Sequence, residues 1–224
     1  RNTKTIMKIF IGHDSKYPQA TEVCKKSLLD FNSSLDIEYL DKAKLKKQGI
    51  YGREDIKGES TEFSFTRFYV PYLMNYEGIA MFCDNDFLWK CDPMEMKMWL
   101  MNNDIAVVKH EDYEPIGTKM DGVKNKSYPR KNWSSLMLFD CGRLKHLTKD
   151  YLDNAKPSEL HELRWADKIG TLPKIYNWLV GIYNQADCEC GPVKAYHYTN
   201  GGPWFDKYKN AEKSLEWWTV YESL

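Results

Sequence analysis

The chain has 224 residues, and 32 Lys and Arg are balanced by 32 Asp and Glu, so its formal net charge at pH 7 is zero. This balance argues against a nucleic-acid binder, which needs excess positive charge to meet phosphates. No apolar run reaches the roughly 18 residues that span a bilayer, and no signal-peptide pattern opens the chain. We therefore expect a cytoplasmic protein without an integral membrane segment, in which residues 1–6 are a cloning remnant or an upstream extension.

Short apolar runs alternate with helical spacings along the chain, which indicates βαβ units. In chain order the pattern predicts a strand at 9–11, a helix at 18–29, a strand at 35–40, a solvated loop at 41–60, a helix at 61–73, a strand at 79–83, a helix at 93–101, strands at 105–108 and 136–139, helices at 144–152 and 159–169, and a strand at 195–198. The long polar stretch 111–131 is typical of a functional or mobile loop. No linker or repeat divides the sequence, so we expect one α/β domain over residues 1–224, with a mainly parallel central sheet flanked by helices.

Aromatic residues make up 14% of the chain, and two interpretations of them stay open. The rings can fill a core, or some can line a groove for flat or sugar-like ligands. Trp133, Trp165 and Trp204 are candidates for stacking on sugar faces, and each is equally a candidate core ring.

The sharpest functional motif is the pair of carboxylates Asp84 and Asp86, which follow the apolar run 79–83 directly. Open α/β sheets bind ligands at the carboxyl ends of their strands, so this position favours a function over an ordinary acidic turn. Two carboxylates that converge can hold Mg²⁺ or Mn²⁺ together with the phosphates of a substrate. The sequence therefore predicts a divalent-cation site.

A second motif lies far along the chain, where His197 leaves a strand and enters the turn 199–204, which contains Gly201 and Gly202. Glycines permit a close approach of the backbone to a ligand, and a neutral imidazole is an acceptable ligand for Mn²⁺. We expect His197 to join Asp84 and Asp86 as a metal ligand.

Six segments, in this order, resemble those of GT-A-fold glycosyltransferases of the Asp-x-Asp type, near the glycogenin and lipopolysaccharide galactosyltransferase group. They are Gly12-His13-Asp14, Thr66-Arg67-Phe68, Asp84-Asn85-Asp86, Lys131-Asn132-Trp133-Ser134-Ser135 with the strand after it, Leu172-Pro173 with Asn177, and His197 with Gly201-Gly202-Pro203-Trp204. The resemblance covers residues 7–206. It implies metal-dependent transfer of a sugar from a nucleoside-diphosphate sugar, with UDP the expected nucleotide, to a hydroxyl of a glycan, a glycoprotein or another acceptor.

The resemblance also implies roles for individual residues. Asp84, Asp86 and His197 would hold Mn²⁺ or Mg²⁺, with Asp84 either a ligand or a contact to ribose, and Arg67 would bind phosphate or the donor sugar. Substrate contacts are further implied for Gly12, His13, Asp14, Asn85, Asn132, Ser134, Ser135, Asn200, Gly201, Gly202 and Trp204.

Two departures from the family pattern bear on the substrate. A lysine often stands just before the Pro-Trp pair to hold the diphosphate, whereas this chain has Gly202 there. The Asn-Ala-Gly of the sugar-binding strand is replaced by Trp133-Ser134-Ser135.

An inverting reaction would need a general base, for which Asp167 is the first candidate and Asp140 the second, whereas a retaining reaction would need no strong base. The sequence leaves both open.

Three other functions are compatible with parts of the pattern. A haloacid-dehalogenase-type phosphatase uses an Asp-x-Asp at a strand end, but usually after its first strand and with Thr or Val where Leu88 stands. A non-catalytic carbohydrate-binding module would explain the aromatic content but not the acidic pair with a distant His. A nucleotide-sugar pyrophosphorylase would require a Gly-rich phosphate loop near the N-terminus, where this chain has Gly12.

Overall fold

The computed structural model describes residues 7–56, 59–111, 118–119, 123–124, 129–184, 186 and 191–224. Residues 1–6 and most of the 111–131 loop, which the sequence predicts to be functional or mobile, lie outside the described part of the chain.

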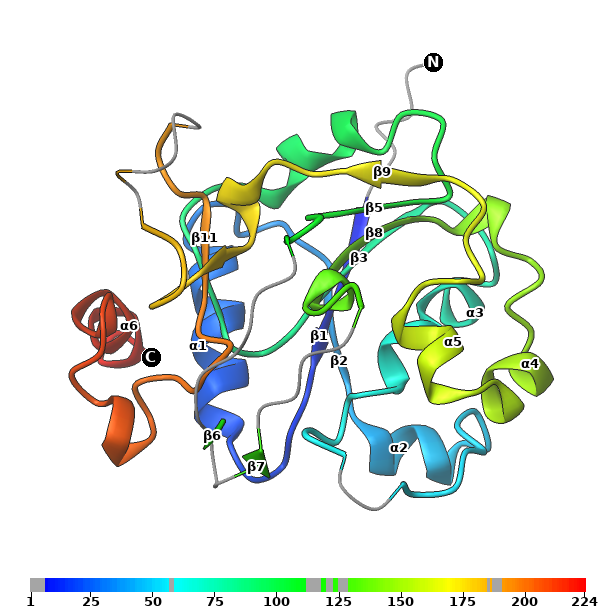
Figure 1. The fold of residues 1–224 in the computed structure, drawn as a ribbon, viewed down its shortest axis with the longest axis horizontal. Coiled ribbons are helices and arrows are strands. Elements are labelled where there is room, and N and C mark those ends of the chain that lie inside the picture. The colour runs from blue at the N-terminus through cyan, green and yellow to red at the C-terminus, as the bar shows by residue number, and fades with distance from the viewer. Residues whose placement is uncertain are drawn as a thin grey trace.

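A six-stranded sheet with the order β2-β1-β3-β8-β5-β9 forms the centre of the molecule (Figure 1). Its strands are β1 (Met7–Gly12), β2 (Ile37–Leu40), β3 (Ile79–Cys83), β5 (Ile105–Val107), β8 (Leu136–Asp140) and β9 (Ile169–Thr171). β1 runs parallel to β2 and β3, and β5 runs parallel to β9, but β8 is antiparallel to both of its neighbours. The predicted α/β fold with a mainly parallel sheet is confirmed, with one strand reversed.

Both faces of the sheet are buried, which explains why its strands are apolar almost throughout. Successive side chains of a strand point to opposite faces. Phe10, Phe82 and Phe139 therefore enter one core, whereas Ile9 and Met81 enter the other. Figure 1 shows α1 on one side of the sheet and α3, α4 and α5 on the other.

The helices are short, apart from α1. They are α1 (Pro18–Leu29), α2 (Lys42–Lys47), α3 (Val70–Leu73), α4 (Lys149–Asn154), α5 (Pro157–His161) and α6 (Ser214–Tyr221), with 3-10 turns at Thr66–Tyr69, Pro93–Trp99, Trp133–Ser135, Cys141–Arg143, Lys174–Tyr176 and Asp206–Tyr208. The prediction for α1 is confirmed at both ends, with Pro18 in its first turn.

Four predicted helices differ in length, place or type. The helix expected at 93–101 is a 3-10 helix over Pro93–Trp99. The helix expected at 61–73 is a 3-10 turn followed by α3, in which Pro71 takes a first-turn position that needs no backbone N–H. The helix expected at 144–152 starts only at Lys149, after the Thr148 hydroxyl accepts the Tyr151 N–H. The helix expected at 159–169 ends early, because Leu163 adopts a positive φ of 54°.

A smaller sheet, with the order β10-β11-β4, lies beside α1 and carries part of the functional site. It contains β4 (Phe87–Trp89), β10 (Trp178–Leu179) and β11 (Ala195–His197). β11 pairs with β4 in antiparallel fashion and with β10 in parallel. Only β11 follows from the sequence pattern, because β4 and β10 are too short to show a period. A two-stranded ribbon, β6 (Thr118–Lys119) with β7 (Val123–Lys124), completes the described strands.

All three tryptophans considered as sugar-stacking rings take part in packing. Trp165 is buried against Phe68 and Phe139. Trp204 is half-buried and packs on Trp217 of α6. Trp133 is half-buried against the core, and its indole N–H donates to the His110 carbonyl at 3.0 Å.

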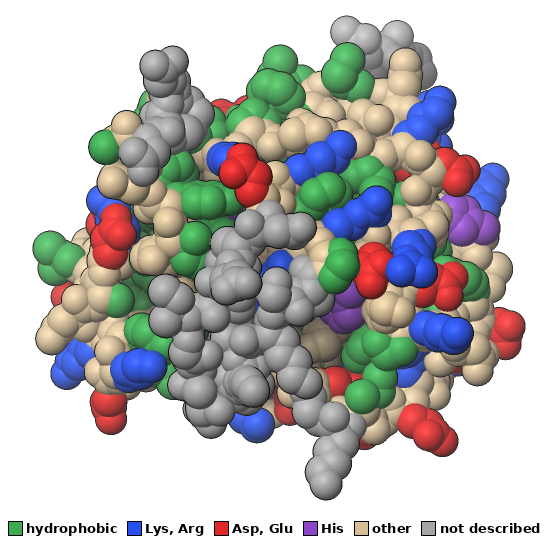
Figure 2. Space-filling view, viewed as in Figure 1, with side chains coloured by type: hydrophobic (Ala, Val, Ile, Leu, Met, Phe, Trp, Pro, Cys, Tyr) green, Lys and Arg blue, Asp and Glu red, His purple; other side chains and the backbone are tan. Residues whose placement is uncertain are grey.

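Charged side chains of both signs are interspersed on the face shown in Figure 2, as the zero net charge suggests. Among the described residues, no helix is long and apolar enough to cross a membrane.

Candidate metal and substrate site

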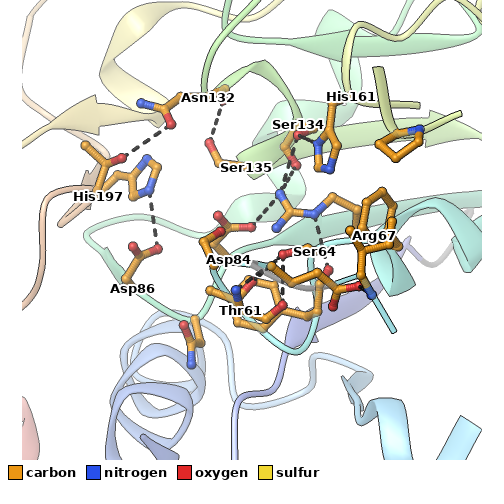
Figure 3. Close-up of a pocket in the computed structure, with 18 of the residues that line it drawn as sticks. Thr61, Ser64, Arg67, Asp84, Asp86, Asn132, Ser134, Ser135, His161 and His197 are labelled. Atoms are coloured by element: carbon orange, nitrogen blue, oxygen red, sulfur yellow. Dashed lines mark hydrogen bonds and ion pairs between the residues drawn. The ribbon is translucent and has the colours of Figure 1, made fainter. Parts of the chain in front are cut away.

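A pocket of about 380 Å³ lies at the edge of the central sheet where β3 ends (Figure 3). Its walls come from the loop before Arg67, the turn after β3, the start of β8, helix α5 and the end of β11. The lining residues are Ile56, Glu59, Ser60, Thr61, Phe63, Ser64, Phe65, Arg67, Asp84, Asn85, Asp86, Asn132, Ser134, Ser135, Pro157, Ser158, His161, Glu162, His197 and Thr199. Eight residues that the sequence marks as site candidates are therefore together: Arg67, Asp84, Asn85, Asp86, Asn132, Ser134, Ser135 and His197.

The three predicted metal ligands meet in this pocket. Asp84 and Asp86 lie in the turn between β3 and β4, and His197 ends β11. The antiparallel register places His197 opposite Phe87, the residue after Asp86. As a result the imidazole Nε2 of His197 lies 3.3 Å from Asp86 Oδ1, and the two side chains point toward each other (Figure 3).

The residues present fit a divalent cation. One atom from each of Asp84, Asp86 and His197 lies within 4.8 Å of the other two. In octahedral coordination with bonds of about 2.1 Å, neighbouring ligand atoms are about 3 Å apart, close to the spacing between His197 and Asp86. Two carboxylates and an imidazole also form a donor set that suits Mn²⁺.

Arg67 forms the wall next to Asp84. Its guanidinium Nη1 lies 2.9 Å from Asp84 Oδ1 and donates to the backbone carbonyl of Ser134 at 2.8 Å. The group is 94% buried and lies over the rings of Phe63 and Phe82. A planar guanidinium held in this way presents fixed donors that match a phosphate or a sugar oxygen.

His197 and the opposite wall are joined by a chain of buried hydrogen bonds. His197 Nδ1 lies 2.8 Å from Asn177 Oδ1, and Asn177 Nδ2 donates to Ser135 Oγ at 2.9 Å. Ser135 Oγ in turn donates to the carbonyl of Asn132 at 2.6 Å. Asn132 adopts the left-handed conformation, with φ 63°, which asparagine tolerates better than most residues.

The structure adds His161 of α5, which sequence reasoning did not identify. Its ring lies edge-on to Phe65 and Phe68, and its Nδ1 is 3.4 Å from Ser134 Oγ. Burial, followed by the charges of Arg67 and Arg53, lowers the pKa of His161 to about 3. The imidazole is therefore neutral near pH 7 and can exchange hydrogen bonds with a hydroxyl. No motif surrounds it in the sequence, so nothing local marks it.

Gly12, His13 and Asp14 lie at the same sheet edge but do not line the pocket. A Cβ on Gly12 would stand 2.4 Å from the ring of Phe63, so the glycine lets this pocket residue pack on β1. The Asp14 carboxylate is buried and accepts the backbone N–H of Glu62 at 3.3 Å. His13 stacks on Tyr39 and lines a separate cavity of about 310 Å³.

Asn200, Gly201, Gly202 and Trp204 also lie outside the pocket lining. A Cβ on Gly202 would stand 1.9 Å from the Trp204 ring, so in this structure the glycine serves a close packing contact. The pocket instead receives Thr199, whose hydroxyl donates to Asn132 Oδ1 at 3.3 Å.

The structure does not bring the two candidate bases, Asp140 and Asp167, to the pocket. Because β8 is antiparallel to β3, Asp140 pairs with Ile79, at the opposite edge of the sheet from Asp84. Its carboxylate is bound to Arg143 at 3.0 Å. Asp167 is exposed at that same far edge, where its backbone N–H donates to Asp104. The rule that places ligands at the carboxyl end of a strand applies to the parallel strands of such a sheet, and β8 is not one of them.

Comparison with known proteins gives one sequence relative and several solved structures. The chain is 39% identical over 223 residues to Protein CDI of Arabidopsis thaliana, an alignment that covers 96% of this chain and 85% of that protein. No protein-family model matches the sequence.

Among solved structures, the galactosyltransferase LgtC, in a complex with donor and acceptor sugar analogues, matches with a TM-score of 0.61 at 12% identity, over 97% of this chain and 96% of LgtC. The glycosyltransferase GlyE of Streptococcus pneumoniae TIGR4 matches with a TM-score of 0.60 at 17% identity over 97% of this chain. The chain spans 60% of the length of the GlyE chain. The shared feature is the GT-A fold.

Proposed function

This chain belongs to the same family as Protein CDI of Arabidopsis thaliana and has the GT-A fold, and from that premise we propose that it is a metal-dependent glycosyltransferase. It transfers a sugar from a nucleoside-diphosphate donor to an acceptor hydroxyl. The observation that carries the proposal is the meeting of Asp84, Asp86 and His197, from distant parts of the chain, in one pocket. LgtC, with the same fold, was solved with donor and acceptor sugar analogues.

The side chains of the pocket have distinct tasks in this proposal. Asp84, Asp86 and His197 hold Mn²⁺ or Mg²⁺, which supplies a Lewis acid for the negative charge that develops on the leaving nucleoside diphosphate. Arg67, fixed by the Ser134 carbonyl, adds donors for phosphate or sugar oxygens.

The hydroxyl-binding groups lie on the wall facing Arg67 and along α5. Ser134, Ser158 and the neutral ring of His161 line this part of the pocket. Neutral donors and acceptors of this kind suit the hydroxyls of a sugar. The rings of Phe63 and Phe65 close the adjacent wall and reduce access of water, which would otherwise hydrolyse the donor.

The pocket favours a retaining over an inverting reaction. Besides Asp84 and Asp86, its described lining includes the carboxylates Glu59 and Glu162. Glu59 is bound to Lys42 at 2.8 Å and Glu162 to Arg164 at 2.6 Å, so each carboxylate is already engaged by a cation. Asp140 and Asp167 do not line the pocket, so the proposal assigns the role of base to neither of them. Retention needs no strong base.

The donor nucleotide is tested first. We expect UDP to bind in calorimetric titrations with Mn²⁺ and to bind much more weakly without it, whereas GDP and CMP serve as comparisons. The matched control is Asp86→Asn, which keeps the size of the side chain and removes its charge. Hydrolysis assays with UDP-sugars then identify the donor. If no nucleotide binds in the presence of metal, the proposal is wrong and phosphatase chemistry or simple carbohydrate binding becomes the better explanation.

A further inference from the structure

We propose that Asn177 is a positioning residue for the metal centre, because its amide holds His197 in the tautomer that carries a proton on Nδ1 and leaves Nε2 available to a cation. The effect on metal binding rests on the proposed metal-dependent function, but the tautomer itself follows from hydrogen bonds between protein groups.

The hydrogen-bond chain begins at Ser135. Its hydroxyl oxygen lies 2.6 Å from the backbone carbonyl of Asn132. A carbonyl oxygen only accepts, so the hydroxyl proton of Ser135 is directed to Asn132. The Ser135 oxygen can therefore only accept from its remaining partner, Asn177, at 2.9 Å.

This requirement decides which way the Asn177 amide faces. Its NH₂ group must face Ser135, so its carbonyl oxygen Oδ1 faces His197 Nδ1 at 2.8 Å. Because Oδ1 only accepts, Nδ1 must carry the proton. A neutral imidazole has one N–H, so Nε2 retains its lone pair, and Nε2 is the nitrogen that lies 3.3 Å from Asp86.

Packing prevents the ring from leaving this arrangement. Asn177 is fully buried, between a 3-10 turn and β10. The His197 ring is stacked on Phe87, with centroids 4.5 Å apart and planes 18° from parallel. β10 and β4 flank β11 on either side. Asn177 directly precedes β10 and Phe87 begins β4, so the amide and the stacking ring are held by different neighbours of β11. Hydrogen-bond partners of this type orient metal-bound histidines, and their loss costs about 10- to 100-fold in metal affinity.

The tautomer is measured by ¹⁵N NMR of metal-free protein labelled at histidine. The signals of His197 are assigned as those that disappear when His197 is substituted. Wild type should show the proton on Nδ1. Asn177→Leu removes the acceptor at similar volume, and should yield a mixture of tautomers. Asn177→Asp keeps an acceptor facing Nδ1 and should restore the Nδ1–H form. The control is Asn154→Leu, at the exposed end of α4, where the side chain bonds to Asp150.

Binding of Mn²⁺ by the same variants is measured by electron paramagnetic resonance. Asn177→Leu should bind Mn²⁺ about 10- to 100-fold more weakly than wild type, whereas Asn177→Asp and Asn154→Leu should bind close to wild type or, for the aspartate, more tightly. If Asn177→Leu does not fold, the wild-type tautomer and the aspartate variant still decide the assignment.

Failure of this inference and failure of the proposed function give different results. A wild-type His197 protonated on Nε2 and not on Nδ1, or a tautomer unchanged by Asn177→Leu, overturns the positioning role even if Mn²⁺ binds. If wild type binds no Mn²⁺, the metal-dependent function is wrong, while the NMR result still tests what Asn177 does to His197.

Discussion

His161 should make the protein less stable as the pH falls from 7 to 5. Burial, then the charges of Arg67 and Arg53, lowers its pKa to about 3 in the folded protein, whereas an exposed histidine titrates near 6.5. Between these two values the unfolded chain binds more protons than the folded one, so the free energy of unfolding decreases as pH decreases. From pH 7 to pH 5 this linkage amounts to about 2 kcal/mol, a large part of the roughly 5–15 kcal/mol that stabilises a typical domain.

The substitution that tests this is His161→Phe, which keeps a ring against the edges of Phe65 and Phe68. Between pH 7 and pH 5, the free energy of unfolding of this variant should decrease by about 2 kcal/mol less than that of wild type. Urea denaturation followed by tryptophan fluorescence at the two pH values measures the difference. Ser134→Ala is the matched control, because it removes the hydroxyl beside His161 but leaves the imidazole, and should keep the wild-type pH dependence.

His110 provides an internal comparison, because burial above all lowers its pKa to about 3 as well. The His161→Phe variant should therefore still lose about 2 kcal/mol between pH 7 and pH 5 because of His110. If wild type and His161→Phe lose the same stability on acidification, then His161 titrates normally in the folded state and its assignment as a permanently neutral pocket group is wrong.

Three further variants test the site and its surroundings. Asp86→Asn should abolish Mn²⁺ binding and donor hydrolysis while changing the melting temperature little, and a loss of folding by circular dichroism would instead indicate a structural carboxylate. Gly202→Ala should lower stability by about 1–3 kcal/mol in thermal unfolding, because the new Cβ would stand 1.9 Å from the Trp204 ring, and an unchanged melting temperature would contradict that packing. Asp140→Asn combined with Asp167→Asn should leave kcat within about twofold of wild type, and a large decrease would show that one of them reaches the reaction.

Local sequence was sufficient to predict five of the six strands of the central sheet, because each of these is a short apolar run, whereas β9 lies where the pattern predicted the end of a helix. β3 was predicted over its full length, and α1 was predicted at both ends. Pro18 marks the start of α1, because proline is favoured in a first helical turn. The acidic pair was identified because it directly follows β3. A parallel strand buried on both faces ends at an edge of the sheet, where the side chains that follow it reach solvent and ligand.

Long-range pairing decided the rest, and it leaves no local signal. An apolar run such as 136–139 is the same whether its strand runs parallel or antiparallel, yet the reversal of β8 carries Asp140 to the far edge. The two- and three-residue strands β10 and β4 form only because each pairs with β11.

By itself, therefore, the sequence determined an α/β fold and the identity of Asp84, Asp86 and His197 as candidate ligands. Only the tertiary structure decided that His197 stands opposite Phe87 and beside Asp86, that Asn177 faces its other nitrogen, and that a half-buried histidine of α5 faces the same pocket. The physical reason is that the pattern of apolar residues, which decides what is buried, is visible in the local sequence. Strand direction, register and hydrogen-bond partners are set instead by contacts between segments far apart in the chain.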